Sequence, residues 1–326
     1  MSKRALIFGI SGQDGSYLAQ LLLAKGYAVF GTSRDAELSS FRNFSILNIR
    51  QQLTLLSASL ADFRSVMQVI KVVDPHEIYN LSGQSSVGLS FSQPMETMES
   101  VVTATFNILE AIRFLNPGIR FYNAGSSECY GHTGEQPANE ETPFRPRSPY
   151  ATAKAAAHWA VANYREAYGL FACSGILFNH ESPLRPERFV TKKIIATAAR
   201  IAAGTEQGPL RLGDLEIRRD WGWAPEYVEV IWRMLQRGEP ADYVVATGRS
   251  WSLQEFVTEA FAAFGYDWRD HVLYDAGLKR PSDIAHSAGD PGRAAAELGW
   301  RARVLMPEVV RRMAEAELRS LAVHQS

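Results

Sequence analysis

The sequence has few cysteines and almost no net charge. Cys129 and Cys173 are too few for a disulfide framework and lack the CxxC spacing of a structural zinc site. The 34 basic and 35 acidic residues nearly cancel, which argues against a broad positive surface for nucleic acid. None of the seven histidines forms an HxxxH pair, so we expect no metal site. These features favour a small-molecule partner.

Long hydrophobic runs are also missing. The apolar stretch from Ala5 to Ile10 is too short for a signal peptide or a membrane segment, so we expect a cytoplasmic protein that does not bind membranes. The 326 residues are 46% hydrophobic and 21% charged, which is ordinary for a globular protein. One large domain or two closely joined domains are expected.

The first half alternates β-rich runs with helical stretches, which is typical of βαβ units and a doubly wound parallel sheet of the α/β class. The predicted strands are Ala5–Gly9, Tyr27–Thr32, Leu53–Ser57, Glu77–Leu81, Arg120–Ala124 and Ala172–Phe178. The predicted helices between them are Ser16–Lys25, Asp62–Val72, Glu96–Phe114 and Pro149–Tyr168.

After residue 178 the texture changes. A loop rich in proline and arginine precedes a predicted helix over 191–203, and another helix is predicted over 307–321. A strand predicted over 242–246 resembles those of the sheet, so the chain returns to the first domain before it ends. We therefore expect a cofactor domain of residues 1–178 and 226–250, interleaved with a smaller α/β substrate domain of residues 179–225 and 251–326.

A glycine-rich loop follows the first predicted strand. Gly9, Gly12 and Gly15 form GxxGxxG directly before a helix, the context of a dinucleotide site in which the backbone approaches a pyrophosphate. An acid near the end of the second strand would favour NAD, whereas an arginine there suits the 2′-phosphate of NADP. Arg34 favours NADP, although Asp35 beside it weakens the distinction.

Two further patterns carry acid–base side chains. Tyr150 and Lys154 share one face of a helix, where the ammonium can favour the phenolate of a group whose pKa is ordinarily near ~10. Ser126 and Glu128 follow the fifth predicted strand, at the edge where such sheets bind ligands. Each pattern alone fits an amphipathic helix or a helix cap equally well.

Together, in this order and spacing, the three patterns resemble the extended short-chain dehydrogenase/reductase superfamily, and within it the GDP-mannose 4,6-dehydratases. The segments that carry this resemblance span nearly the whole chain. They are Gly12-Gln-Asp-Gly-Ser-Tyr-Leu, Tyr79-Asn-Leu, Thr142 to Tyr150, Gly175 to Pro183, Phe189-Val-Thr-Lys-Lys193, Arg219-Asp-Trp-Gly222 and Ala246-Thr-Gly248.

The resemblance implies a redox-neutral reaction of a nucleotide sugar. NADP would oxidise C4 of the hexose while Tyr150 takes the hydroxyl proton, Glu128 would remove the C5 proton as water leaves C6, and hydride would return to C6. Lys154 would hold the nicotinamide ribose and Ser126 would assist Tyr150. The product would be a 4-keto-6-deoxy sugar nucleotide, and the enzyme a homo-oligomer, dimer or tetramer.

The resemblance also implies the remaining binding residues. Cofactor contacts are expected from Gly9, Gly12, Gln13, Asp14, Gly15, Arg34, Ser59, Leu60, Leu81, Ser82, Gly83, Ser85, Tyr150, Lys154, His180 and Arg185. Substrate contacts are expected from Ser85, Asn179, Glu181, Val190, Lys193, Gly213, Arg219, Arg280 and Asp283.

The sequence departs from this family's pattern at several of these places. Ser126 stands where the family has Thr, and Ser59 stands where an Asp reads the adenine. Leu184 and Pro186 replace an Arg and a Gly, while Asp214 and Trp223 replace an Asn and a His near the nucleotide pocket. These changes leave open another sugar, such as a GDP-heptose, or another base.

Two alternatives to the dehydratase remain open from the sequence. An NADPH-dependent 4-keto-sugar reductase or epimerase of the same superfamily would share the Gly125-Ser-Ser-Glu128 turn. The Glu-Ser-Pro after Asn179-His180 favours the dehydratase. A non-catalytic NADP-sensing module is disfavoured, because such a protein usually loses the Tyr or the Lys.

Overall fold

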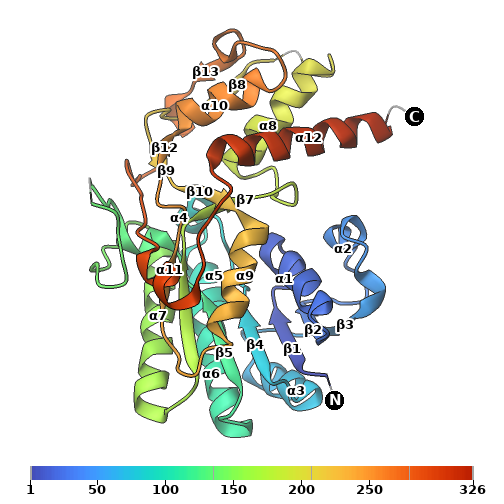
Figure 1. The fold of residues 1–326 in the computed structure, drawn as a ribbon, viewed down its shortest axis with the longest axis vertical. Helices are drawn as coiled ribbons and strands as arrows, with labels where there is room; N and C mark the ends of the chain where they lie inside the picture. Colours follow the sequence, from blue (N-terminus) through green and yellow to red (C-terminus); the bar gives the residue numbers. More distant parts are fainter. Residues whose placement is uncertain (1, 135, 207, 279, 325–326) are drawn as a thin grey trace.

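Seven parallel strands form the main sheet of the protein (Figure 1). The computed structural model describes residues 2–134, 136–206, 208–278 and 280–324. The strand order is β11-β6-β5-β4-β1-β2-β3, the doubly wound topology that the sequence predicts. The strands are β1 (Arg4–Phe8), β2 (Ala28–Ser33), β3 (Leu53–Ser57), β4 (Glu77–Asn80), β5 (Arg120–Ala124), β6 (Ala172–Leu177) and β11 (Tyr243–Val245).

Helices cover both faces of this sheet because the strands are apolar on both sides. One face packs against α1 (Gln13–Ala24), α2 (Arg42–Ile46), α9 (Ala224–Met234) and α11 (Gly292–Leu298). The other face packs against α3 (Phe63–Val73), α6 (Ala104–Leu115) and α7 (Pro149–Tyr168). Strand β11 pairs with β6 although 65 residues separate Leu177 from Tyr243, so the chain does return to the sheet.

Helix α7 has the bounds predicted from the sequence. It begins at Pro149 because the Ser148 hydroxyl accepts a hydrogen bond from the Ala151 N–H at 3.1 Å, and it ends where Gly169 adopts a left-handed conformation (φ 65°). Helix α1 begins at Gln13, three residues before the predicted start, because Gly12 already serves as its N-terminal cap.

The helix predicted over 96–114 is wrong in one respect, because it is interrupted. A wide π turn over Glu99–Thr103 separates α5 (Pro94–Met98) from α6. At this turn the Ser100 hydroxyl accepts a hydrogen bond from the Gln84 N–H at 3.2 Å. A Cβ on Gly83 would meet the Ser100 carbonyl at 3.0 Å. The loop that follows β4 therefore packs against this turn. Helix α4 (Val87–Ser92) comes directly after that loop.

A smaller group of elements forms a cap above the carboxyl ends of the strands (Figure 1). Helices α8 (Val190–Ala202), α10 (Leu253–Ala262) and α12 (Met306–His324) share one apolar core with β8 (Leu210–Leu212) and β13 (Val272–Tyr274). Two short strand pairs join the cap to the main sheet. They are β7 (Asn179–Glu181) with β10 (Trp221–Trp223), and β9 (Arg218–Arg219) with β12 (Trp251–Ser252).

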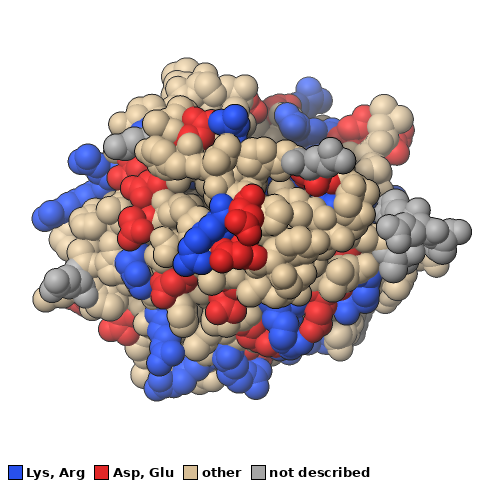
Figure 2. Space-filling view, turned by 90° about the horizontal axis from the view of Figure 1, so that it is seen from above, with Lys and Arg blue, Asp and Glu red and all other residues tan. Residues whose placement is uncertain are grey.

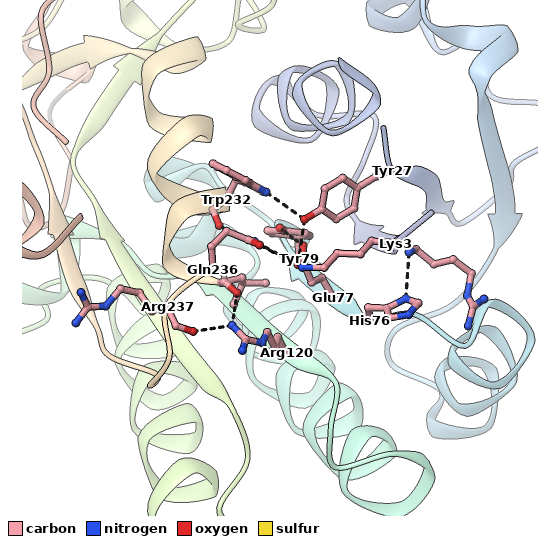
Figure 3. A network of polar contacts seen from close by, with 11 residues as sticks. Lys3, Tyr27, His76, Glu77, Tyr79, Arg120, Trp232, Gln236 and Arg237 are labelled. Carbon is pink, nitrogen blue, oxygen red and sulfur yellow. Dashed lines mark hydrogen bonds and ion pairs between the residues drawn. The ribbon is translucent and has the colours of Figure 1, made fainter. Parts of the chain in front are cut away.

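At the amino ends of the strands, a buried carboxylate joins several elements through hydrogen bonds (Figure 3). Glu77 is fully buried, and its carboxylate accepts hydrogen bonds from Lys3 at 3.1 Å, Tyr27 at 3.1 Å, Gln236 at 3.2 Å and Tyr79 at 2.7 Å. Three of these donors, Lys3, Tyr27 and Gln236, lie outside β4, so the network ties β4 to the first part of the chain and to the segment just after α9. Because its oxygens are satisfied by the protein, Glu77 is not a free carboxylate.

The surface seen from above, over the cap, carries interspersed acidic and basic side chains (Figure 2). Among the described residues, no helix has the length and apolar character needed to cross a membrane.

Candidate active site

The residues predicted to bind or react follow the carboxyl ends of the parallel strands. The glycine-rich loop follows β1, Arg34 follows β2, and Ser59 and Leu60 follow β3. The segment from Leu81 to Ser85 follows β4, Ser126 and Glu128 follow β5, and Asn179 begins β7 directly after β6. Since parallel strands end at one edge, residues far apart in the sequence share that edge.

The glycine-rich loop forms an open cradle. A Cβ on Gly9 would meet the Leu81 carbonyl group at 2.7 Å, and one on Gly15 would meet the Gly9 carbonyl oxygen at 2.4 Å. These two glycines are required by the fold itself. Gly12 is exposed, and its Cβ would meet only the Gly9 carbonyl oxygen, at 3.4 Å. The space above Gly12 and the unpaired N–H groups of the first turn of α1 therefore suit a phosphate group.

The two charged residues after β2 behave differently. Asp35 turns back on its own loop, where its carboxylate accepts hydrogen bonds from the N–H groups of Glu37 at 3.0 Å and Leu38 at 2.8 Å. Arg34 is exposed and makes no hydrogen bond or ion pair with another described residue. The Asp35 carboxylate is therefore already hydrogen-bonded within its own loop, whereas the Arg34 guanidinium is free to bind an anion.

Ser126, Tyr150 and Lys154 meet beneath this edge. Tyr150 and Lys154 are 8% and 7% exposed, and the Ser126 hydroxyl hydrogen-bonds the phenol. The Lys154 amine donates to the Ala124 carbonyl at 2.8 Å and lies 5.9 Å from the centre of the Tyr150 ring. Burial lowers the pKa of Lys154 to about 8, so this amine titrates near neutral pH.

The expectation that Lys154 lowers the pKa of Tyr150 is wrong, because that pKa is raised. Burial raises the pKa of Tyr150 well above its ordinary value, and the hydrogen bond from Ser126 offsets this only in part. The Lys154 ammonium is directed at the Ala124 carbonyl, so it does not outweigh the desolvation of the phenol. The phenol is protonated at neutral pH.

Glu128 lies among charged residues of the cap. Burial raises the pKa of its carboxyl, while the nearby guanidinium groups of Arg219 and Arg280 oppose the shift. Arg219 is 6% exposed and donates to the Ile284 carbonyl at 2.6 Å. Asp283 lies 3.5 Å from Arg219 and 3.8 Å from Arg280. The structure thus brings together one predicted base and three predicted substrate residues.

The strand β7 connects this cluster to the glycine-rich loop. His180 contacts Asp14 at 2.9 Å, and the Gln13 side chain donates to the His180 carbonyl at 3.1 Å. Glu181 is buried and paired with Arg185 at 3.1 Å, and the Arg185 guanidinium stacks on the Phe189 ring. Predicted cofactor residues from two distant segments are therefore in direct contact.

The other predicted residues line the two ends of the edge. Backbone groups of Ser59, Leu60 and Leu81 are bonded to Ser65, Asn107 and Phe8, and the Ser82 hydroxyl is bonded to Asn80. In the cap, Val190 begins α8, the Lys193 amine donates to the Arg211 carbonyl at 3.1 Å, and Gly213 faces Leu278. Asp214 beside it accepts the Glu216 N–H at 2.9 Å.

Two residues of this site were not singled out from the sequence. Ser182, which is fully buried, donates its hydroxyl hydrogen bond to Gln13 at 2.7 Å. Asp220, also fully buried, accepts the N–H groups of Thr247 at 3.0 Å and Gly248 at 2.9 Å, which fixes the strand that carries Arg219. Both lie within the segments Asn179–Pro183 and Arg219–Gly222, which carry the family resemblance. Membership of these segments was the sequence feature that could have pointed to them.

The arrangement provides a phosphate cradle, a phenol with a hydroxyl and an amine beside it, and a carboxyl beside two arginines. Such groups can move a proton from a hydroxyl and a second proton from carbon, next to a bound anion. The Cys129 thiol takes no part, since burial raises its pKa to about 12. Among the described residues there is no group of side chains suited to a metal ion.

Comparison with known proteins gives a consistent result. The family model described as GDP-mannose 4,6 dehydratase matches residues 6–313. A GDP-mannose 4,6 dehydratase from Arabidopsis thaliana is 44% identical over 326 residues, which cover 97% of this chain and 90% of the relative.

Solved structures with the same fold include a dTDP-glucose 4,6-dehydratase from Streptomyces venezuelae with NAD bound, at a TM-score of 0.87 and 21% identity, covering 98% of each chain. The protein RMD from Pseudomonas aeruginosa, solved with NADPH, gives a TM-score of 0.80 at 22% identity and covers 98% of this chain and all of that one. At these identities the likeness is one of fold.

The two kinds of glycine in the loop make a testable pair. We expect Gly15→Ser to lower the thermal unfolding midpoint by several degrees, because its Cβ would overlap the Gly9 carbonyl. Gly12→Ser should unfold close to the wild-type temperature, since serine is a good N-terminal cap and its Cβ has room. Differential scanning calorimetry checks this, and equal losses in both variants would contradict it.

Proposed function

The chain belongs to the GDP-mannose 4,6-dehydratase family, which are hydro-lyases, and we propose that Tyr150, Lys154, Ser126 and Glu128 form its catalytic site. Their meeting at the carboxyl edge of the sheet, beside the phosphate cradle, supports this proposal. The comparisons do not favour the reductase or epimerase as the alternative function.

The proposed substrate is GDP-mannose, and the single observation that carries the proposal is the position of Glu128. A carboxyl among Arg219, Arg280 and Asp283 is suited to a sugar whose diphosphate is held by the two arginines. Asn179, Glu181, Val190, Lys193, Gly213 and Ser85 would complete the nucleotide-sugar site. An epimerase at C4 needs no base at C5, so the presence of Glu128 favours the dehydratase reaction over 4-epimerisation.

We propose NADP as the cofactor. The open cradle at Gly12 would accept its pyrophosphate, and the unpaired Arg34 guanidinium would accept the 2′-phosphate, while the Asp35 carboxylate is already engaged by its own loop. The remaining cofactor contacts would come from the residues that follow β3 and β4, and from Tyr150, Lys154, His180 and Arg185. When bound, the cofactor supplies the oxidant at C4 and the reductant at C6.

Proton transfers fall to the residues of the chain. Tyr150 would accept the proton of the 4-hydroxyl, aided by the Ser126 hydroxyl and by the positive charge of Lys154 one helical turn away. The resulting 4-ketone acidifies the C5 hydrogen. Glu128 would remove that proton and pass a proton to the C6 hydroxyl, which leaves as water; once hydride has returned to C6, C5 would take a proton that has exchanged with solvent. The raised pKa of Glu128 makes its carboxylate a stronger base than an exposed one.

We propose that the chain works as two interleaved domains, with residues 1–178 and 226–250 binding the cofactor and residues 179–225 and 251–326 binding the sugar nucleotide. The position of β11 in the main sheet supports the return of the chain. We depart from this division at one place: Ala294, Leu298 and Trp300 pack in the same core as α1 and α9, so we assign residues 292–300 to the cofactor domain instead of the sugar-nucleotide domain. Both cysteines are free thiols, which agrees with a cytoplasmic enzyme.

The reaction itself provides the main test. Incubated with GDP-mannose and NADP+ in heavy water, the protein should release one water per substrate, place one deuterium at C5 and consume no NADP+. Glu128→Gln should lower the rate roughly 10²- to 10⁴-fold, since a positioned base is lost. Mass spectrometry follows both events, with Glu141→Gln at an exposed turn as the matched control. Full turnover by Glu128→Gln would refute the assigned base.

Cofactor preference is tested at the end of β2. Replacing Arg34 with Ala should weaken NADP+ about tenfold or more while leaving NAD+ nearly unchanged, because only NADP+ has the 2′-phosphate. Asp35→Ala serves as the neighbouring control and should not lower the preference for NADP+. Dissociation constants from equilibrium dialysis give the ratio, and an unchanged ratio in the Arg34 variant would contradict the assignment.

We also propose that the chain forms a homo-oligomer through α5, α6 and α7. Large apolar side chains are exposed on these neighbouring helices, namely Met95, Phe106, Phe114, Trp159 and Tyr168. A second copy of the same face would cover them. Light scattering should give a multiple of the 36.2 kDa chain mass, and Trp159→Glu should reduce it to one chain. Val72→Glu, on α3, should not, and a monomeric wild type would refute the proposal.

A further inference from the structure

Polar side chains at the start of α1 are interlocked with β7, across more than 160 residues of sequence. The Gln13 amide group donates to the His180 carbonyl at 3.1 Å and accepts the Ser182 hydroxyl at 2.7 Å. The Asp14 carboxylate accepts a hydrogen bond from Gln13 at 3.0 Å and contacts the His180 ring at 2.9 Å. Gln13, His180 and Ser182 are 7%, 7% and 0% exposed, so water does not replace these bonds.

The surroundings of His180 favour a protonated ring. Its Nδ1 lies 2.7 Å from the Phe178 carbonyl oxygen, and its Nε2 lies 2.9 Å from the Asp14 carboxylate, so both nitrogens face acceptors. A neutral imidazole has one N–H, whereas the cation has two. Burial acts to lower the pKa of His180, but Asp14 raises it overall, and the pKa of Asp14 is lowered in turn.

Few other charged groups face this pair. Arg185 is the second cation near Asp14 and opposes the protonation of His180. The Tyr227 ring of α9 stacks on the imidazole at 4.5 Å between ring centres, and burial raises the pKa of its phenol, which stays neutral. Lys154, with its pKa of about 8, feels the Asp14 charge from further away. His180 is therefore the direct neutralising partner of Asp14.

This pairing has a consequence for the cofactor site. Asp14 is the second residue of α1, and the first turn of α1 forms the phosphate cradle. An unpaired carboxylate there would repel a pyrophosphate, because both are anions in a partly buried place. We infer that protonated His180 is a positioning residue, whose charge neutralises Asp14 and keeps the start of α1 open to the cofactor pyrophosphate. This inference rests on the proposed cofactor site.

The sign of the pH dependence follows. The His180 cation is present below its raised pKa, which lies above the ordinary 6.5, and is lost as the pH rises through it. Loss of the cation exposes the charge of Asp14, so the affinity for NADP+ should fall on the alkaline side. Lys154 also loses its proton near pH 8, so its titration has to be separated from that of His180.

A double-mutant cycle makes that separation. We would measure NADP+ dissociation constants of the wild type, Asp14→Asn, His180→Gln and the double variant by equilibrium dialysis, from pH 6 to 9 at fixed salt. His180→Gln should bind NADP+ roughly tenfold or more weakly, because Asp14 is left unneutralised. Adding Asp14→Asn to it should recover most of that loss. His76→Gln, at the opposite edge of the sheet, is the matched control.

The outcomes are distinct. If the double variant binds as weakly as His180→Gln, the network acts only by shape and the inference is overturned. Should His180→Gln fail to fold, the alkaline loss of affinity decides. It should be larger in the wild type than in Asp14→Asn, which keeps His180 and Lys154 but has no carboxylate for the loss of the His180 cation to expose. Equal losses would overturn the inference. A wild type that converts no GDP-mannose and binds no NADP+ would instead overturn the proposed function, and this inference with it.

Discussion

All seven strands of the main sheet run in the same direction, and the rest of the structure depends on that constraint. Because each strand ends at one edge, short segments from six places in the sequence are delivered to a common surface. The other edge is closed by the buried Glu77 and its four donors, which join β4, the start of the chain and α9. The proposed chemistry thus lies at the carboxyl ends of the strands, and a stabilising network lies at their amino ends.

The cap reaches the chemical edge through very short elements. Strands β7 and β10 pair over three residues, and β9 and β12 over two, yet they carry Asn179, Glu181 and Arg219. Buried polar contacts, and not the length of the strands, hold these residues in position. Asp220 fixes the loop after β11, and the contacts of Gln13 and Asp14 hold β7 against the glycine-rich loop. The proposed cofactor and sugar sites are therefore parts of one connected framework.

Local signals in the sequence were enough for the sheet and for α7, whose bounds are set by Ser148 and Gly169. They were not enough for the π turn over Glu99–Thr103, which depends on a loop packed against it. The pKa of Tyr150 could not be read from its spacing to Lys154, because it depends on burial and on the direction of the ammonium. The pairing of Asp14 with His180 likewise arises only when β7 reaches α1.

We propose that one site oxidises C4, removes water and reduces C6 without releasing an intermediate. The most direct test is GDP-mannose that carries deuterium at C4, mixed with an equal amount of substrate labelled with ¹³C in the sugar. We expect the deuterium to appear at C6 of the same molecules that lost it from C4. Deuterium transferred to the ¹³C-labelled sugar, or absent from C6, would contradict it.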